Sequence, residues 1–235
     1  IANFLQKNIY KVVFLLTPFA LLLSVVLRKL NYLWWIITND IPYLESLAYS
    51  VNRWGPRKNI SAVGTELSYH WFALAWSGMT SAAAGAQPFV VSTKFLPIIS
   101  MLGAVMLVWA SVRSLTKSRL ASMFAVVIFI FNDNLLNTSP VRLFHSPTYL
   151  FAVVWMLAFV FIFTKSLNGR VRYSPLLLAI MLFACFGGKV SHGAVTAAGF
   201  GLAALIGFIW RQSPAITRFL LQTSAMLAAT VVVAY

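Results

Sequence analysis

The sequence predicts an all-α membrane protein: a polytopic helix bundle of about seven transmembrane helices, with two amphipathic interfacial helices in the first external loop. Hydrophobic residues make up 60% of the chain and charged residues only 9%. Apolar runs long enough to cross a bilayer recur throughout, and no soluble domain, internal repeat or low-complexity tract interrupts them. Residues 1–235 are therefore interpreted as a single transmembrane module. Since the chain begins at Ile1 and stops at Tyr235 inside an apolar run, we expect it to be the N-terminal part of a longer protein.

Seven apolar runs are candidate membrane spans. The first, Tyr10–Leu27, is not followed by a small-residue cleavage site, so we expect a retained helix rather than a cleaved signal. The runs at 120–131 and 175–187 are short for a full crossing, which leaves tilted or re-entrant helices open as alternatives. The other predicted spans are Phe95–Val112, Leu120–Phe131, Thr148–Thr164, Pro175–Gly187, Ala194–Trp210 and Phe219–Tyr235.

The basic residues predict the orientation of these spans. With the N-terminus cytoplasmic, each short cytoplasmic segment contains Lys or Arg and no acidic residue, which satisfies the positive-inside rule. All acidic residues and all histidines then lie on the opposite face, which is periplasmic, extracellular or lumenal. The basic residues of the cytoplasmic segments are Lys7, Lys11, Arg113, Lys117, Arg119, Lys165, Arg170, Arg172, Arg211 and Arg218.

The net charge of +14 does not indicate a nucleic-acid partner, because Lys and Arg occur singly or in pairs between apolar runs. We interpret these residues as topology signals and as contacts for membrane lipids. The one cysteine, Cys185, lies inside an apolar run, so the chain cannot form an internal disulfide.

The first external loop, residues 28–94, is predicted to contain the two interfacial helices. The segment Asn39-Asp40-Ile41-Pro42 is typical of a helix start, and apolar residues then recur at helical spacing as far as the break at Gly55-Pro56. The first helix is therefore expected near 41–54, and a second near 65–84. The first is too short and too amphipathic to span a bilayer, so we expect it to lie in the membrane interface, and we expect the same of the second.

These elements together resemble the C-type (GT-C) membrane glycosyltransferases, which use lipid-linked sugars. The matching features are a first span that ends in Arg, an aromatic interfacial stretch, an acidic residue that opens an amphipathic helix, and a second helix with Tyr-His-Trp. The positions are Arg28, Trp34-Trp35, Asp40, Pro42-Tyr43, Gly55 and Tyr69-His70-Trp71. The resemblance implies a polyprenyl-phosphate sugar lipid as donor.

The resemblance also implies that Asp40 is the catalytic base or a metal-site carboxylate. A hydroxyl acceptor that attacks a sugar phosphate must lose its proton, and a carboxylate near the interface can accept it. Many members carry an Asp-Glu pair at this point. Asn39-Asp40 in this chain leaves Asp40 as the single carboxylate, and a divalent metal stays open as a cofactor. A helix cap is the alternative role for Asp40.

The other candidates are substrate-binding residues. A leaving phosphate needs cations, which Arg142 offers between the third and fourth spans. The segment Gly187–Gly193 places Lys189 and His192 among glycines at the outer membrane boundary, which suits either a phosphate contact or a tight turn with an interfacial lysine.

Three residues of the first external loop complete the set. Tyr69 and His70 belong to the second interfacial helix and are candidates for holding the sugar or the lipid. Glu45 follows Asp40 in the first helix and is either a second functional carboxylate or a solvated one. Glu66 and His70 are spaced to share a metal or to form a structural pair, and without a third ligand we predict no metal site.

The leading functional hypothesis is a glycosyltransferase of the cell envelope or lumen, which transfers a sugar from a polyprenyl-phosphate donor to an acceptor on the non-cytoplasmic side. A non-catalytic subunit of a larger membrane complex and a lipid or solute transporter are the alternatives. The interiors of the predicted spans contain no Asp, Glu, Lys, Arg or His, which argues against ion-coupled transport. Other subunits, or a domain that follows Tyr235, are the expected protein partners.

Overall fold

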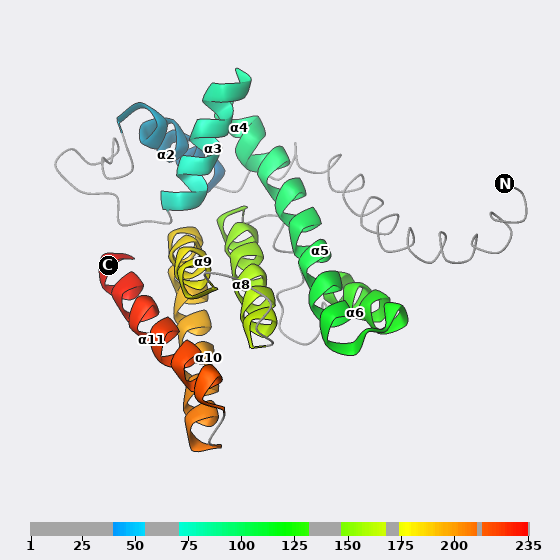
Figure 1. The fold of residues 1–235 in the computed structure, drawn as a ribbon. Helices are drawn as coiled ribbons and strands as arrows, with labels where there is room; N and C mark the ends of the chain where they lie inside the picture. The colour runs from blue at the N-terminus through cyan, green and yellow to red at the C-terminus, as the bar shows by residue number, and fades with distance from the viewer. Residues whose placement is uncertain (1–39, 55–70, 132–146, 168–173, 211–212, 235) are drawn as a thin grey trace, which may run out of the picture.

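The computed structural model of the chain describes residues 40–54, 71–131, 147–167, 174–210 and 213–234. All regular structure in these ranges is helical, which confirms the predicted all-α class. Figure 1 shows the helices as a bundle with two short helices, α2 and α3, packed across one end. The predicted first span, Tyr10–Leu27, lies outside the described residues.

Four helices of the described ranges are long and apolar enough to cross a membrane. One is the continuous helix Pro88–Thr116, formed by α4 (Pro88–Val90), the π-helical turn η1 (Val91–Phe95) and α5 (Leu96–Thr116). The others are α8 (Pro147–Ser166), α10 (Val190–Ile209) and α11 (Pro214–Ala234). These helices give the chain the character of a membrane protein.

Two further apolar helices, α6 (Arg119–Phe131) and α9 (Ser174–Gly188), are shorter than the four candidate spans. They correspond to the two predicted runs that are short for a full crossing. The predicted spans thus recur as helices wherever the structure describes them, but only four reach spanning length. The second span also begins earlier than expected, because Pro88 opens a helix that continues through η1 into α5.

Helix α2 (Asp40–Trp54) agrees closely with the predicted helix near 41–54. Helix α3 (Trp71–Ala84) covers the later part of the second predicted helix, whose expected start at 65 precedes the described residues. One side of α3 packs against α2, where Leu74 lies with Leu47 and Ala48. Its other side packs on the bundle through an aromatic group of Phe72, Phe151 and Trp155. Helix α3 therefore connects α2 to α8.

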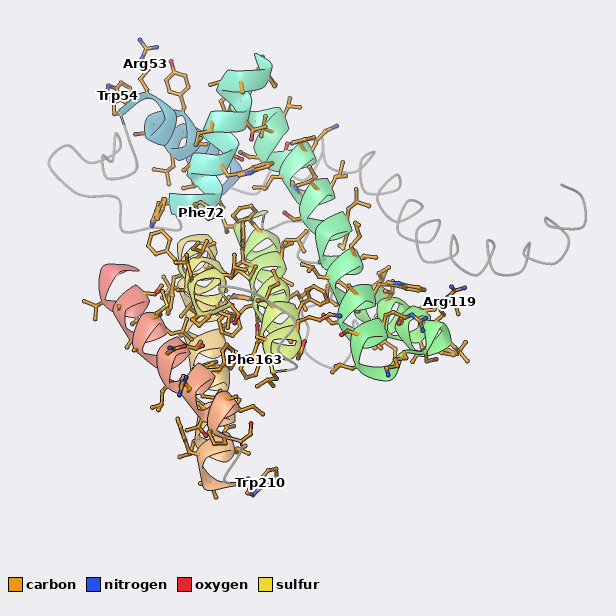
Figure 2. All side chains as sticks on the ribbon, in the orientation of Figure 1. Arg53, Trp54, Phe72, Arg119, Phe163 and Trp210 are labelled. Atoms are coloured by element: carbon orange, nitrogen blue, oxygen red, sulfur yellow. The ribbon has the colours of Figure 1, made fainter. Side chains whose placement is uncertain are left out.

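Helix α9 lies at the centre of the bundle and packs against α8, α10 and α11. An apolar core joins these helices, and its aromatic part includes Phe159 and Phe163 of α8 with Phe200 of α10. Figure 2 shows Phe163 inside the bundle and Trp210 at the end remote from α3. A second core joins α5, α6 and α8.

Two glycines allow the end of α9 to approach its neighbours closely. A Cβ atom at Gly187 would lie 2.6 Å from Cβ of Phe72 on α3, and one at Gly188 would lie 3.1 Å from Cα of Ala152 on α8. The thiol of Cys185 lies one turn before, 3.6 Å from the carbonyl oxygen of Ala152. Small residues at such contacts let helix backbones approach closely, which is a principal source of helix association in membranes.

Replacing Gly187 with Ala should therefore destabilise the fold by about 1–3 kcal/mol, the usual cost of forcing an extra methyl group into a packed contact. The measurement is the apparent melting temperature in detergent, followed by reaction of the single buried thiol, Cys185, with a fluorogenic maleimide. The matched control is Gly201→Ala on α10, which has open space around its Cβ position and gains helix propensity. A Gly187→Ala variant as stable as the Gly201→Ala variant would contradict the packing argument.

Candidate functional site

The candidate site lies where α9 ends and α10 begins, beside the first turn of α8. Three side chains meet there: Tyr149 from α8, Lys189 from the junction and His192 from the first turn of α10. The neighbouring end of α9 contacts α3, so the site belongs to the end of the bundle that α3 covers. The structure thus brings together two of the residues predicted from the sequence, Lys189 and His192.

Lys189 is the one residue that separates α9 from α10. Its backbone is extended, with φ of −159° and ψ of 121°, and this turns the chain sharply between the two helices. Its amide donates to the carbonyl oxygen of Cys185 at 2.9 Å, and its own carbonyl oxygen accepts from the amides of His192 at 3.0 Å and Gly193 at 3.2 Å. Because this backbone is held on both sides, the direction in which the Lys189 side chain leaves the main chain is fixed.

Tyr149 contacts both basic side chains. The ammonium nitrogen of Lys189 lies 5.4 Å from the centre of the Tyr149 ring, within the range of a cation–π interaction. The imidazole of His192 meets the same ring edge to face, with the ring centres 4.1 Å apart. Nδ1 of His192 also lies 3.4 Å from the hydroxyl oxygen of Ser191. His192 is only 9% exposed, whereas Lys189 is half-buried.

The glycines of this segment have a different role from the one expected. In a phosphate-binding loop they would let backbone amides approach the ligand, but Gly187 and Gly188 lie inside α9 and Gly193 lies inside α10. A Cβ atom at Gly193 would overlap the ring of Phe186. The amides of Lys189 and Gly193 are hydrogen-bonded to carbonyl oxygens. The segment is therefore a tight helix junction, which is the alternative interpretation of the sequence.

Aromatic side chains line the neighbouring contact between α3 and the bundle. Trp71 of α3 meets Phe183 of α9 with ring centres 5.6 Å apart, and Phe72 meets Phe151 of α8 at the same distance. Figure 2 shows Phe72 directed from α3 toward the ends of α8 and α9. The basic residues are therefore close to an extensive apolar contact, an environment that suits a ligand with both a charged and an apolar part.

Glu45 is not part of this cluster. It is half-buried on α2, which packs on α3 through Leu47 and Ala48, whereas the cluster lies on α8 and at the α9–α10 junction. Asp40 is the first residue of α2, as the predicted helix start requires, but its side chain lies outside what the structure describes. Tyr69, His70 and Arg142 also lie outside the described residues. Their predicted roles therefore remain predictions.

No group of three or more His, Cys, Asp or Glu residues that could hold a metal ion occurs within the described ranges. The candidate site instead offers an ammonium group, an imidazole and two hydroxyl groups, from Tyr149 and Ser191. These are hydrogen-bond donors suited to the oxygens of an anion such as a phosphate, because charge-assisted hydrogen bonds to phosphate are among the strongest in proteins.

Tyr149 is the member of the site that the sequence analysis did not identify. It appears in the sequence as the second residue of the predicted span 148–164, among apolar residues. The signal that could have identified it is its position, because a tyrosine at the end of a span commonly lies at the membrane interface. Its contacts with residues some forty positions later depend on the packing of α8 against the α9–α10 junction.

Comparison of the chain with protein-family models, with curated proteins and with solved structures finds no significant match.

The Tyr149 ring, rather than its hydroxyl group, should hold Lys189 and His192 in place. Tyr149→Phe keeps the ring and should leave stability nearly unchanged, whereas Tyr149→Leu should cost about 1–3 kcal/mol through loss of the aromatic and cation–π contacts. The measurements are the melting temperature and the ring-proton shifts of His192 in protein labelled at histidine. Equal effects of the two variants, or an unshifted His192 signal in Tyr149→Leu, would show that the ring does not position these residues.

Proposed function

We propose that the chain is the transmembrane module of a glycosyltransferase that transfers a sugar from a polyprenyl-phosphate donor to an acceptor on the non-cytoplasmic side. The observation that carries the proposal is the group of Lys189, His192 and Tyr149 at the end of an apolar bundle covered by α3. A lipid-linked sugar phosphate combines an anionic group with a long apolar chain. This site combines phosphate-binding side chains with an apolar surrounding.

The length of the helix Pro88–Thr116 supports an interfacial position for α2 and α3. Its 29 residues extend about 44 Å, whereas the hydrocarbon core of a bilayer is about 30 Å thick. Part of the helix must therefore reach beyond the hydrocarbon core or tilt strongly. Helices α2 and α3 pack on its N-terminal part, α4 and η1. We propose that they lie at the outer membrane surface, within a module of about seven spans.

In the proposed reaction Asp40 accepts the proton of the acceptor hydroxyl as that oxygen attacks the anomeric carbon, and the polyprenyl phosphate leaves. Lys189, His192 and Arg142 stabilise the charge on the phosphate, and Tyr69, His70 and Glu45 contact the sugar or the acceptor. A carboxylate base and cationic groups for the leaving phosphate are the two requirements of this chemistry. A divalent metal and other subunits are compatible with the proposal.

The role of Lys189 is tested by donor turnover in nanodiscs with radiolabelled polyprenyl-phosphate sugars. Lys189→Ala should raise the KM for the donor about 10- to 100-fold, because a hydrogen bond to a charged group contributes about 1.5–3 kcal/mol. Lys165→Ala is the matched control. Lys165 lies over the ring of Phe161 at 5.6 Å, in a similar contact near the other end of α8, and its loss should leave the KM unchanged. Equal effects of the two variants would contradict a phosphate contact at Lys189.

The role of Asp40 is tested in the same assay. Asp40→Asn should lower kcat by about 10²- to 10⁴-fold, the usual contribution of a general base, while donor binding is retained. Normal transfer by Asp40→Asn would show that Asp40 is not the catalytic base. If the wild type consumes none of the donors, the glycosyltransferase proposal fails, and a non-catalytic subunit or a transporter takes its place.

The proposed orientation is tested with single cysteines, since Cys185 is the only native cysteine and is buried. Arg53 on α2 and Lys117 after α5 are both exposed. In intact cells a membrane-impermeant maleimide should label Arg53→Cys directly and Lys117→Cys only after the membrane is permeabilised. If only Lys117→Cys is labelled in intact cells, the chain has the opposite orientation to the one proposed.

A further inference from the structure

The turn between α5 and α6 concentrates positive charge at the edge of the bundle. Arg113 lies in the last turn of α5, Lys117 follows the helix, and Arg119 is the first residue of α6. Lys117 and Arg119 are exposed, and Figure 2 shows Arg119 at the outer edge of the molecule, away from α9 to α11. Between residues 71 and 131 the sequence contains no Asp or Glu, so α3 to α6 supply no negative charge to balance this group.

Two of these cations occupy positions that the backbone disfavours. Lys117 has φ of 56° and ψ of 6°, a left-handed conformation at the end of a helix where glycine is usual. Arg119 opens α6, where the positive end of the helix dipole opposes a cation. The locally favoured residues here would be a glycine and an acidic or neutral residue. An interaction with an anion outside the chain would offset the cost of both cations.

The backbone of the turn is held by its own side chains. The Ser118 amide donates to the Thr116 hydroxyl oxygen at 3.2 Å, and the Ala121 amide donates to the Ser118 hydroxyl oxygen at 3.2 Å. The Lys117 amide donates to the carbonyl oxygen of Arg113 at 3.0 Å. These backbone groups are therefore already paired, and the cationic side chains are the charged groups of the turn that can bind an external anion.

Exposed leucines flank the cations and indicate the kind of anion. Leu115 is 64% exposed and Leu120 is 52% exposed. A soluble phosphate or an acidic protein surface would leave these side chains in water or in a polar contact. A phospholipid instead supplies a charged phosphate next to its acyl chains, which matches cations and leucines within residues 115–120. In membranes, juxtamembrane cations attract anionic lipids in this way.

We propose that the α5–α6 turn is a binding site for an anionic phospholipid, with Lys117 and Arg119 on the headgroup phosphate and Leu115 and Leu120 against the acyl chains. The site is separate from the Lys189 cluster and does not depend on the proposed glycosyl transfer. It faces the same side of the membrane as the other cations of the predicted cytoplasmic segments, where anionic lipids are enriched.

The test is a titration of the detergent-solubilised full chain with phosphatidylglycerol or phosphatidylcholine, with bound lipid counted by native mass spectrometry. The test variant is Lys117→Gly/Arg119→Gln, in which glycine also suits the positive φ and so favours folding. Its apparent affinity for phosphatidylglycerol should fall about 25-fold, since each of the two cations near an anionic surface contributes about 5-fold. The matched control, Lys165→Gln/Arg218→Gln, removes the same charge elsewhere and should stay within about 2-fold of the wild type.

Three outcomes would contradict the proposal of a phospholipid site. An equal loss of affinity in both double variants would show that binding depends on the net charge of the protein and not on this turn. Equal binding of phosphatidylcholine and phosphatidylglycerol by the wild type would remove the anionic preference. Displacement of bound phosphatidylglycerol by excess inorganic phosphate would make the ligand a free anion rather than a lipid.

Discussion

The close approach of α9 to α3 and α8 is the contact on which the described structure depends. Gly187 leaves room for Phe72 of α3, and Gly188 leaves room for the backbone of α8 at Ala152. Inside a membrane, apolar helices gain little from leaving lipid, so close packing and interhelical hydrogen bonds must hold them together. The same contact brings the start of α10 to Tyr149, because a single residue, Lys189, separates α10 from the tightly packed end of α9.

Helix α3 connects this contact to the rest of the chain. It packs on α2 through Leu74, on α9 through the ring of Trp71 and on α8 through the ring of Phe72. The relation between the start of α2, where Asp40 lies, and the Lys189 cluster therefore depends on how α3 packs. A change at Gly187 or Phe72 would disturb both the fold and the candidate site, so effects on activity should be compared with effects on stability.

Within the part of the chain that the structure describes, two lysines with cation–π contacts illustrate how similar local geometry can serve different purposes. Lys189 lies 5.4 Å from the ring of Tyr149, and Lys165 lies 5.6 Å from the ring of Phe161. Lys189 also has His192 beside it and the aromatic contact of α3 nearby, whereas Lys165 is in the last turn of α8. Lys165 is thus a single cation at a helix end, whereas Lys189 belongs to a group of convergent donors, and such a group suits a bound phosphate.

The helical class, the boundaries of α2 and the position of most apolar helices follow from local sequence patterns, because apolar length, helical periodicity and caps act within a few residues. The role of the glycines in the segment 187–193 cannot be decided from such patterns. Both a backbone amide that approaches a phosphate and a tight contact between helices require the absence of a Cβ atom. Phe72, Ala152 and Phe186 decide in favour of packing, and the first two come from other helices. The partnership of Tyr149 with Lys189 and His192 likewise depends on helices packing side by side, an interaction between distant parts of the chain that no local pattern contains.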